Sequence, residues 1–213
     1  MKKKKFFWLA SVYLSAFVLW TVLVRLVDVQ PIGPEGSAVG FATLNRFVHD
    51  LTGVNWTLYA VTDWLGLLPL GVAFGFAVFG LWQWIKRKSL LRVDRSILVL
   101  GGFYAAVAAV YGFFEAVVIN YRPVLVDGVL EASYPSSTTL LVLCVMPTAM
   151  MQWSERIKSR SVRRGSSVAI VAFVAFMVIV RVFSGVHWIT DIVGGILLSA
   201  GLVTVYRWMS YTK

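Results

Sequence analysis

Long apolar runs separated by short polar segments dominate the sequence. Each run holds about 20 residues, the length that crosses the hydrocarbon core of a bilayer as an α-helix. We therefore predict an all-α polytopic membrane protein with six transmembrane helices, built as a single membrane-embedded domain over residues 1–213. The predicted spans cover residues 6–26, 64–85, 96–119, 135–153, 167–183 and 186–206.

The segment 31–56, between the first two runs, has a different pattern. Its apolar residues recur at helical spacing, whereas the polar side chains between Asn45 and Asp50 fall largely off that face. The apolar positions are Phe41, Leu44, Phe47, Val48 and Leu51. This pattern predicts a short helix that lies on the outer membrane interface.

Composition and charge narrow the class further. Hydrophobic residues make up 59% of the chain and charged residues only 14%, whereas soluble domains carry about 25% charge. The net charge of +10 could indicate nucleic acid, but its placement argues against that partner. Lys and Arg cluster at the two termini and in two short segments near residues 86–95 and 156–164; the others are Arg25, Arg46, Arg122 and Arg181.

This distribution follows the positive-inside rule and predicts that both termini are cytoplasmic. The lysine-rich start and the short loops favour a bacterial cytoplasmic membrane. With this topology, the polar segments 115–138 and 181–191 both open on the outer face, where we expect the active site.

The segment 181–191 carries the strongest chemical signal. Ionisable residues close to membrane depth are expensive and therefore indicate function. His187 and Asp191 are four residues apart, so on a helix the carboxylate can hold the imidazole. Arg181 adds a guanidinium suited to phosphate oxygens. Together these residues indicate a histidine nucleophile that acts on a phosphate.

Three separated motifs strengthen this interpretation. They are Glu115 to Arg122-Pro123, then Pro135-Ser136-Ser137-Thr138, then Arg181 to Asp191 with Gly194-Gly195 soon after. In order and spacing they resemble the signature of the type 2 phosphatidic acid phosphatase family, which is Lys-x6-Arg-Pro, Pro-Ser-Gly-His and Ser-Arg-x5-His-x3-Asp. The resemblance covers roughly residues 57–206.

The resemblance implies a metal-independent lipid phosphatase that needs no cofactor. His187 would form a phosphohistidine intermediate, and Asp191 would orient it. The residues that bind the substrate phosphate would be Arg122, Arg181, Ser136 and Ser137. The implied partners are a lipid phosphate substrate and the bilayer, and the oligomeric state stays open.

The first two motifs are degenerate. Glu115 stands at the family lysine, Ser137 at the glycine and Thr138 at the histidine that is the family's general acid. A threonine hydroxyl is too weak an acid for that role. One explanation is a substrate, such as undecaprenyl diphosphate, whose leaving group needs little protonation. The other is that the chain binds lipid phosphate or a membrane partner without turnover. Glu115 is either a substitute proton donor or a partner that neutralises Arg122.

Other polar or reactive residues receive structural interpretations. Asp63, beside Trp64, is interpreted as an interfacial residue. His49 with Asp50 is also assigned to the interface, with a stand-in acid as the alternative. Cys144 lies inside an apolar run and is expected to be a small core residue.

Overall fold

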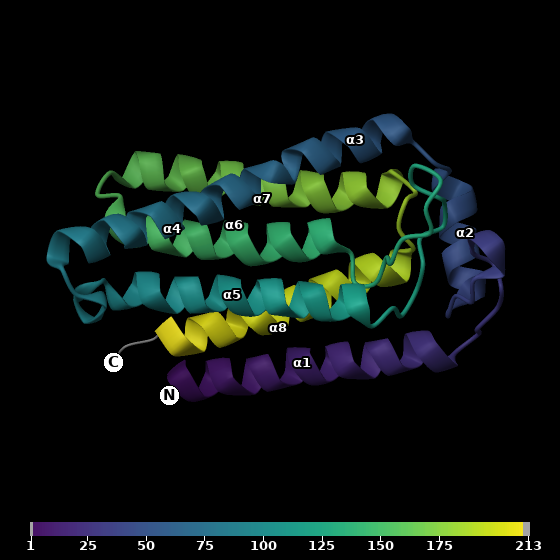
Figure 1. Cartoon of the computed structure of the whole chain (residues 1–213), viewed down its shortest axis with the longest axis horizontal. Helices are drawn as coiled ribbons and strands as arrows, with labels where there is room; N and C mark the ends of the chain where they lie inside the picture. The colour runs from purple at the N-terminus through teal and green to yellow at the C-terminus, as the bar shows by residue number, and fades with distance from the viewer. Residues whose placement is uncertain (1, 211–213) are drawn as a thin grey trace.

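Six helices of twenty or more residues run side by side in the computed structural model, which describes residues 2–210 (Figure 1). Two shorter helices and two 3-10 turns, Pro34–Gly36 and Leu90–Arg92, complete the regular structure of these residues. The α-helices are α1 (Lys2–Leu26), α2 (Ala42–Thr52), α3 (Trp56–Leu65), α4 (Leu67–Arg87), α5 (Arg95–Ala116), α6 (Ser137–Arg156), α7 (Arg160–Phe183) and α8 (Ile189–Ser210).

Five stretches of the described chain are long and apolar enough to cross a membrane, which confirms the all-α polytopic class. They are Lys3–Leu26, Trp56–Arg87, Arg95–Ala116, Arg160–Phe183 and Ile189–Ser210. The predicted span 135–153, which corresponds to α6, is not among them. This helix carries buried polar residues such as Thr148 and Gln152 and packs against α4, α5, α7 and α8. A helix surrounded by protein tolerates polar groups that lipid would not, so a sixth crossing remains a prediction.

Two of the apolar stretches begin about two turns before the predicted spans. The second span begins at Trp56 rather than at residue 64, because Asn55 caps α3 through a hydrogen bond from the Leu58 amide (3.0 Å), and only Gly66 separates α3 from α4. The fifth begins at Arg160 rather than at residue 167, because the Ser159 hydroxyl caps α7. Side-chain oxygens at such positions satisfy amides that lack a partner in the first turn.

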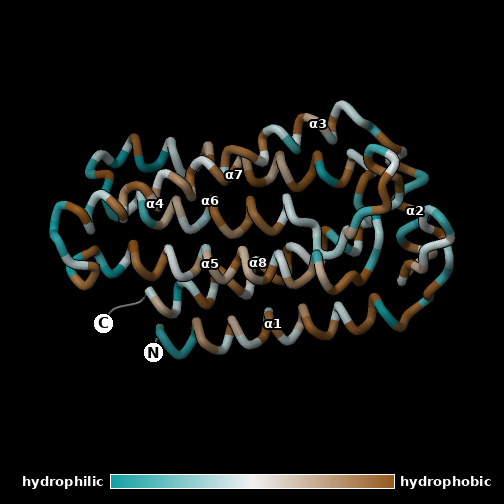
Figure 2. The backbone as a smooth tube through the Cα atoms, in the orientation of Figure 1, coloured by the Kyte–Doolittle hydropathy of each residue, from teal (hydrophilic) through white to brown (hydrophobic). Residues whose placement is uncertain are grey.

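The two ends of the bundle differ in what they carry. The start of α1 and the end of α8 lie at one end, and α2 lies at the other with the long connection 117–136 (Figure 1). Figure 2 shows hydrophilic residues concentrated at the helix ends and in the connections. The predicted helix in segment 31–56 is confirmed as α2, which exposes Leu44, Phe47 and Leu51. Its placement on the outer membrane surface remains a prediction.

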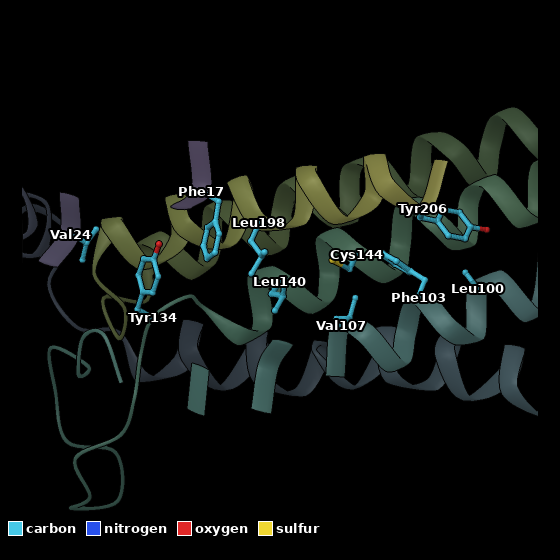
Figure 3. Packing of buried hydrophobic residues seen from close by; sticks show 10 residues of the cluster. All are labelled: Phe17, Val24, Leu100, Phe103, Val107, Tyr134, Leu140, Cys144, Leu198 and Tyr206. Atoms are coloured by element: carbon cyan, nitrogen blue, oxygen red, sulfur yellow. The ribbon is translucent and has the colours of Figure 1, made fainter. Parts of the chain in front are cut away.

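A buried cluster joins α1, α5, α6 and α8, and Tyr134, the second residue before Ser136, lies near one end of it (Figure 3). The Tyr134 ring stacks on Phe17 with centroids 6.2 Å apart, and its hydroxyl lies 2.7 Å from Thr21 Oγ1. Cys144 is fully buried in this cluster, as expected for a core residue. The core therefore anchors the second motif at the start of α6.

Gly194 makes room for this anchor. A Cβ atom at that position would lie 2.6 Å from Cε2 of Tyr134, and a Cβ at Gly195 would lie 3.2 Å from Thr139. These close approaches bring α8 against the start of α6. The motif glycines thus hold the second and third motifs together.

We predict that Gly194→Val lowers the free energy of unfolding by about 1–3 kcal/mol, because the added methyl groups overpack a rigid aromatic ring. The matched control is Gly101→Val, where no atom lies within 4 Å of the added Cβ. Reversible unfolding by sodium dodecyl sulfate in mixed micelles measures both variants. Equal stabilities of the two variants would show that Gly194 does not limit the packing.

Candidate active site

His187 lies in the short connection between α7 and α8 and is only 5% exposed. Gly185 shapes this connection. Its φ is +67°, and a Cβ there would lie 1.8 Å from the carbonyl oxygen of Gly53. Only glycine fits such a turn pressed against another backbone segment. The connection therefore turns the imidazole inward, toward two arginines.

Arg122 and Arg181 converge on the same ring nitrogen. Arg122 Nη1 lies 3.4 Å from His187 Nε2, and Arg181 Nη2 lies 3.3 Å from it. A guanidinium can only donate hydrogen bonds, so Nε2 accepts them and carries no proton. The ring proton is therefore assigned to Nδ1, and the lone pair of Nε2 faces the two arginines.

Helix α3 supports the arginine pair from the side. Arg181 Nη1 donates to the Thr62 hydroxyl (3.0 Å). The ring of Tyr59 lies 5.0 Å from Cζ of Arg181 and 5.9 Å from Cζ of Arg122. Contact between an aromatic ring and a guanidinium stabilises the cation.

Asp191 lies on the opposite side of the imidazole, in the first turn of α8. Its Oδ2 is 3.8 Å from His187 Nδ1, too long for a hydrogen bond, and accepts the Trp188 amide (3.0 Å). Its Oδ1 accepts from the Asn120 side chain (3.1 Å). This fully buried carboxylate thus ties the histidine turn to the loop that carries Arg122.

The connection 117–136 forms an irregular hairpin that positions Arg122. Tyr121 and Ala132 form an antiparallel bridge, and the Arg122 amide donates to the Glu131 carbonyl (3.0 Å). The side chains of Arg122 and Glu131 also form an ion pair, with Arg122 Nε 2.9 Å from Glu131 Oε2. The geometry of this contact is not that of a hydrogen bond. The carboxylate beside Arg122 is therefore that of Glu131, and the alternative that Glu115 neutralises this arginine is not supported. Glu115 is exposed near the end of α5.

The second motif meets this group at the start of α6. Ser136 is fully buried; its amide donates to the Asp191 carbonyl (3.1 Å), and its hydroxyl accepts from Thr139 (3.0 Å). Its backbone amide is thus already engaged. Ser137 and Thr138 are half-buried in the first turn of the helix, where amides have no carbonyl partner within the helix.

The residues that α3 contributes were not expected from the sequence. Tyr59, Thr62, Asp63 and Gly66 follow the spacing i, i+3, i+4, i+7, which places them on one helix face. That periodicity was visible, but a predicted start at residue 64 excluded most of the face. Asp63 therefore belongs to a helix face that contacts the site.

A cavity of about 420 Å³ lies between α4, α5 and α6. Its walls are largely apolar, with residues such as Leu67, Leu70 and Val107. Asp63, Ser137 and Thr138 also line it. The cavity joins an apolar space to the second motif.

Comparison with known proteins identifies the family of the chain. Residues 70–213 match the PAP2 superfamily, so the chain belongs to this family, the type 2 phosphatidic acid phosphatases that the three motifs resemble. The fold is similar to the crystal structure of a transmembrane PAP2 type phosphatidylglycerolphosphate phosphatase from Bacillus subtilis, with 14% identity, coverage of 94% of each chain and a TM-score of 0.62. No curated protein sequence matches the chain.

Burial is the main cause that holds the pKa of His187 well below its ordinary value of 6.5, and the positive charges of Arg122 and Arg181 lower it further. The folded protein therefore keeps this imidazole neutral at a pH where an exposed histidine takes up a proton. A neutral imidazole is the form that can act as a nucleophile.

This pKa predicts an acid-sensitive fold. Below about pH 6.5 the unfolded chain binds a proton at His187 that the folded chain excludes, so the free energy of unfolding falls as the pH is lowered. We expect His187→Gln, which cannot titrate, to flatten this fall between about pH 7 and pH 5. Unfolding by sodium dodecyl sulfate across that range measures it. Parallel profiles for the two proteins would contradict a neutral His187.

Proposed function

We propose that the protein is a metal-independent lipid phosphatase that works through a phosphohistidine on His187. The observation that carries the proposal is the convergence of two guanidinium groups on Nε2, at 3.4 and 3.3 Å. A phosphate group placed between them would meet both arginines and the lone pair of the nucleophile at once.

The arginine pair has unused capacity to bind an anion. Arg181 is 1% exposed, and its Nε has no hydrogen-bond partner among the described residues. Buried donors without partners are costly, and phosphate oxygens would satisfy them. Two arginines would also stabilise the charge on the equatorial oxygens during phosphoryl transfer.

Asp191 supports the histidine from the other side. The carboxylate lies on the Nδ1 side of the ring and is fixed by Trp188 and Asn120. It would stabilise the positive charge that develops on the imidazole when Nε2 bonds to phosphorus. A closure of the 3.8 Å separation in the substrate complex is consistent with the loose geometry of many free active sites.

We further propose that the preferred substrate is a polyprenyl diphosphate such as undecaprenyl diphosphate. Thr138 stands where the family places its general acid, and a departing phosphate is a far weaker base than an alkoxide. The apolar cavity beside Ser137 and Thr138 suits a hydrocarbon chain. The charge distribution favours a site on the outer face of the membrane, where the diphosphate would be presented.

His187→Ala is expected to lower phosphate release by more than about 10³-fold, because the nucleophile is removed. The assay uses purified protein in detergent with a chelator, and offers undecaprenyl diphosphate, phosphatidylglycerophosphate and phosphatidic acid. The control is Asp127→Asn, a change at an exposed residue of the connection 117–136, which should release phosphate at the wild-type rate. Release that survives His187→Ala, or that requires a divalent metal, would contradict the proposal.

Arg122→Ala and Arg181→Ala should each lower kcat/KM about 10²–10³-fold, the usual effect of removing one donor to a transition-state anion. Phosphate release and equilibrium binding of the lipid separate the two candidate functions. If wild-type protein binds the lipid phosphate through these arginines but releases no phosphate, the chain is a binding protein rather than an enzyme.

A further inference from the structure

We propose that Asp63 is the general base that activates water in the second half of the reaction. The inference rests on the proposed function and adds a catalytic residue to it. A diphosphate leaving group needs no proton, but the phosphohistidine must still be hydrolysed. The water that does this must lose a proton, and Thr138 cannot take it.

Asp63 lies on the face of α3 that contacts the arginine pair. Thr62, the residue before it, accepts a hydrogen bond from Arg181, and Tyr59, one turn earlier, packs on both guanidinium groups. Asp63 therefore directly follows a residue that holds one of the two arginines.

Asp63 also shares a cavity with Thr138, the position of the family's acid. The link between α3 and α4 approaches Thr138, since a Cβ at Gly66 would lie 3.7 Å from its Cγ2. Threonine is smaller than histidine and leaves open space at this point. A carboxylate from α3 thus faces the space where an imidazole from α6 would stand.

The other acidic residues near the site are less suitable. Glu131 forms the ion pair with Arg122, and Asp191 is fully buried behind the imidazole. Glu115 lines a separate, much smaller cavity with Ser133 and Pro135. Asp63 is exposed toward the larger cavity, so it can exchange a proton with water.

The proposed reaction has two chemical steps. In the first, the lone pair of His187 Nε2 attacks the terminal phosphorus, and the bond to the bridging oxygen breaks with its electron pair leaving on the lipid monophosphate. In the second, a water oxygen attacks the phosphorus and the N–P bond returns its pair to Nε2. One water proton goes to the Asp63 carboxylate, and the other stays on the inorganic phosphate.

Asp63→Asn should therefore slow the second step and spare the first. With undecaprenyl diphosphate labelled by ³²P at the terminal phosphate, we expect phosphate release to fall about 10²–10⁴-fold, the usual contribution of a general base. Labelled phosphohistidine, stable to alkali and labile to acid, should accumulate toward one equivalent per chain. Rapid formation of this species also shows that the variant is folded.

Asp127→Asn is the matched control, because it makes the same change on the exposed hairpin at a residue with φ +51°, which asparagine tolerates. It should release phosphate at the wild-type rate without accumulation of label. Wild-type phosphate release by Asp63→Asn would overturn the inference. An equal loss of phosphohistidine formation and phosphate release would also overturn it, since Asp63 would then act in binding. If His187→Ala leaves phosphate release unchanged in the same assay, the proposed function is contradicted. The inference about Asp63, which depends on that function, is then contradicted too.

Discussion

Two guanidinium groups and one imidazole share a buried site. Contacts with the surrounding structure offset the free energy that is needed to remove these groups from water. Taking a charged group out of water is expensive unless other groups compensate it. The Thr62 hydroxyl, the Tyr59 ring and the Glu131 carboxylate each contact one or both arginines. Because these groups come from α3 and from the hairpin 117–136, the site forms only when those segments close over α7 and α8. The site therefore depends on the packing of the whole fold. The glycines that allow close packing of these segments contribute indirectly to the position of the arginines.

The same arrangement accounts for the nucleophile role that we propose for His187 near neutral pH. Burial and neighbouring positive charge hold the pKa of His187 below its ordinary value and keep the imidazole neutral. The arginines fix which nitrogen carries the lone pair, and Asp191 lies on the side of the other nitrogen. Glu131 pairs with Arg122 alone, so an incoming phosphate would add negative charge beside Arg181, whose Nε has no hydrogen-bond partner among the described residues. In the proposed mechanism, substrate binding and activation of the nucleophile share one electrostatic cause.

The sequence predicted the residues of the site better than it predicted their supports. Arg122, Arg181, His187 and Asp191 were found because ionisable residues stand out in an apolar chain and follow a recognisable spacing. Tyr59 and Thr62 were not predicted, because their contacts with the arginines depend on how α3 packs in the bundle. No local sequence pattern encodes this packing. The polar side chains of α6 are another example. The helices that pack around α6, rather than its own composition, decide whether polar side chains are tolerated there. Helix starts at Asn55 and Ser159 were missed because capping residues extend a helix into polar sequence beyond the apolar run.

The most direct test of the account is a structure of the protein bound to orthovanadate, an analogue of the phosphoryl group in transfer. We predict vanadium within bonding distance of His187 Nε2, with Arg122 and Arg181 each donating to its oxygens and Asp191 remaining on the Nδ1 side. Vanadate bound away from Nε2, or held by the arginines while the imidazole turns elsewhere, would contradict the claim that the arginine pair delivers a phosphate to this histidine.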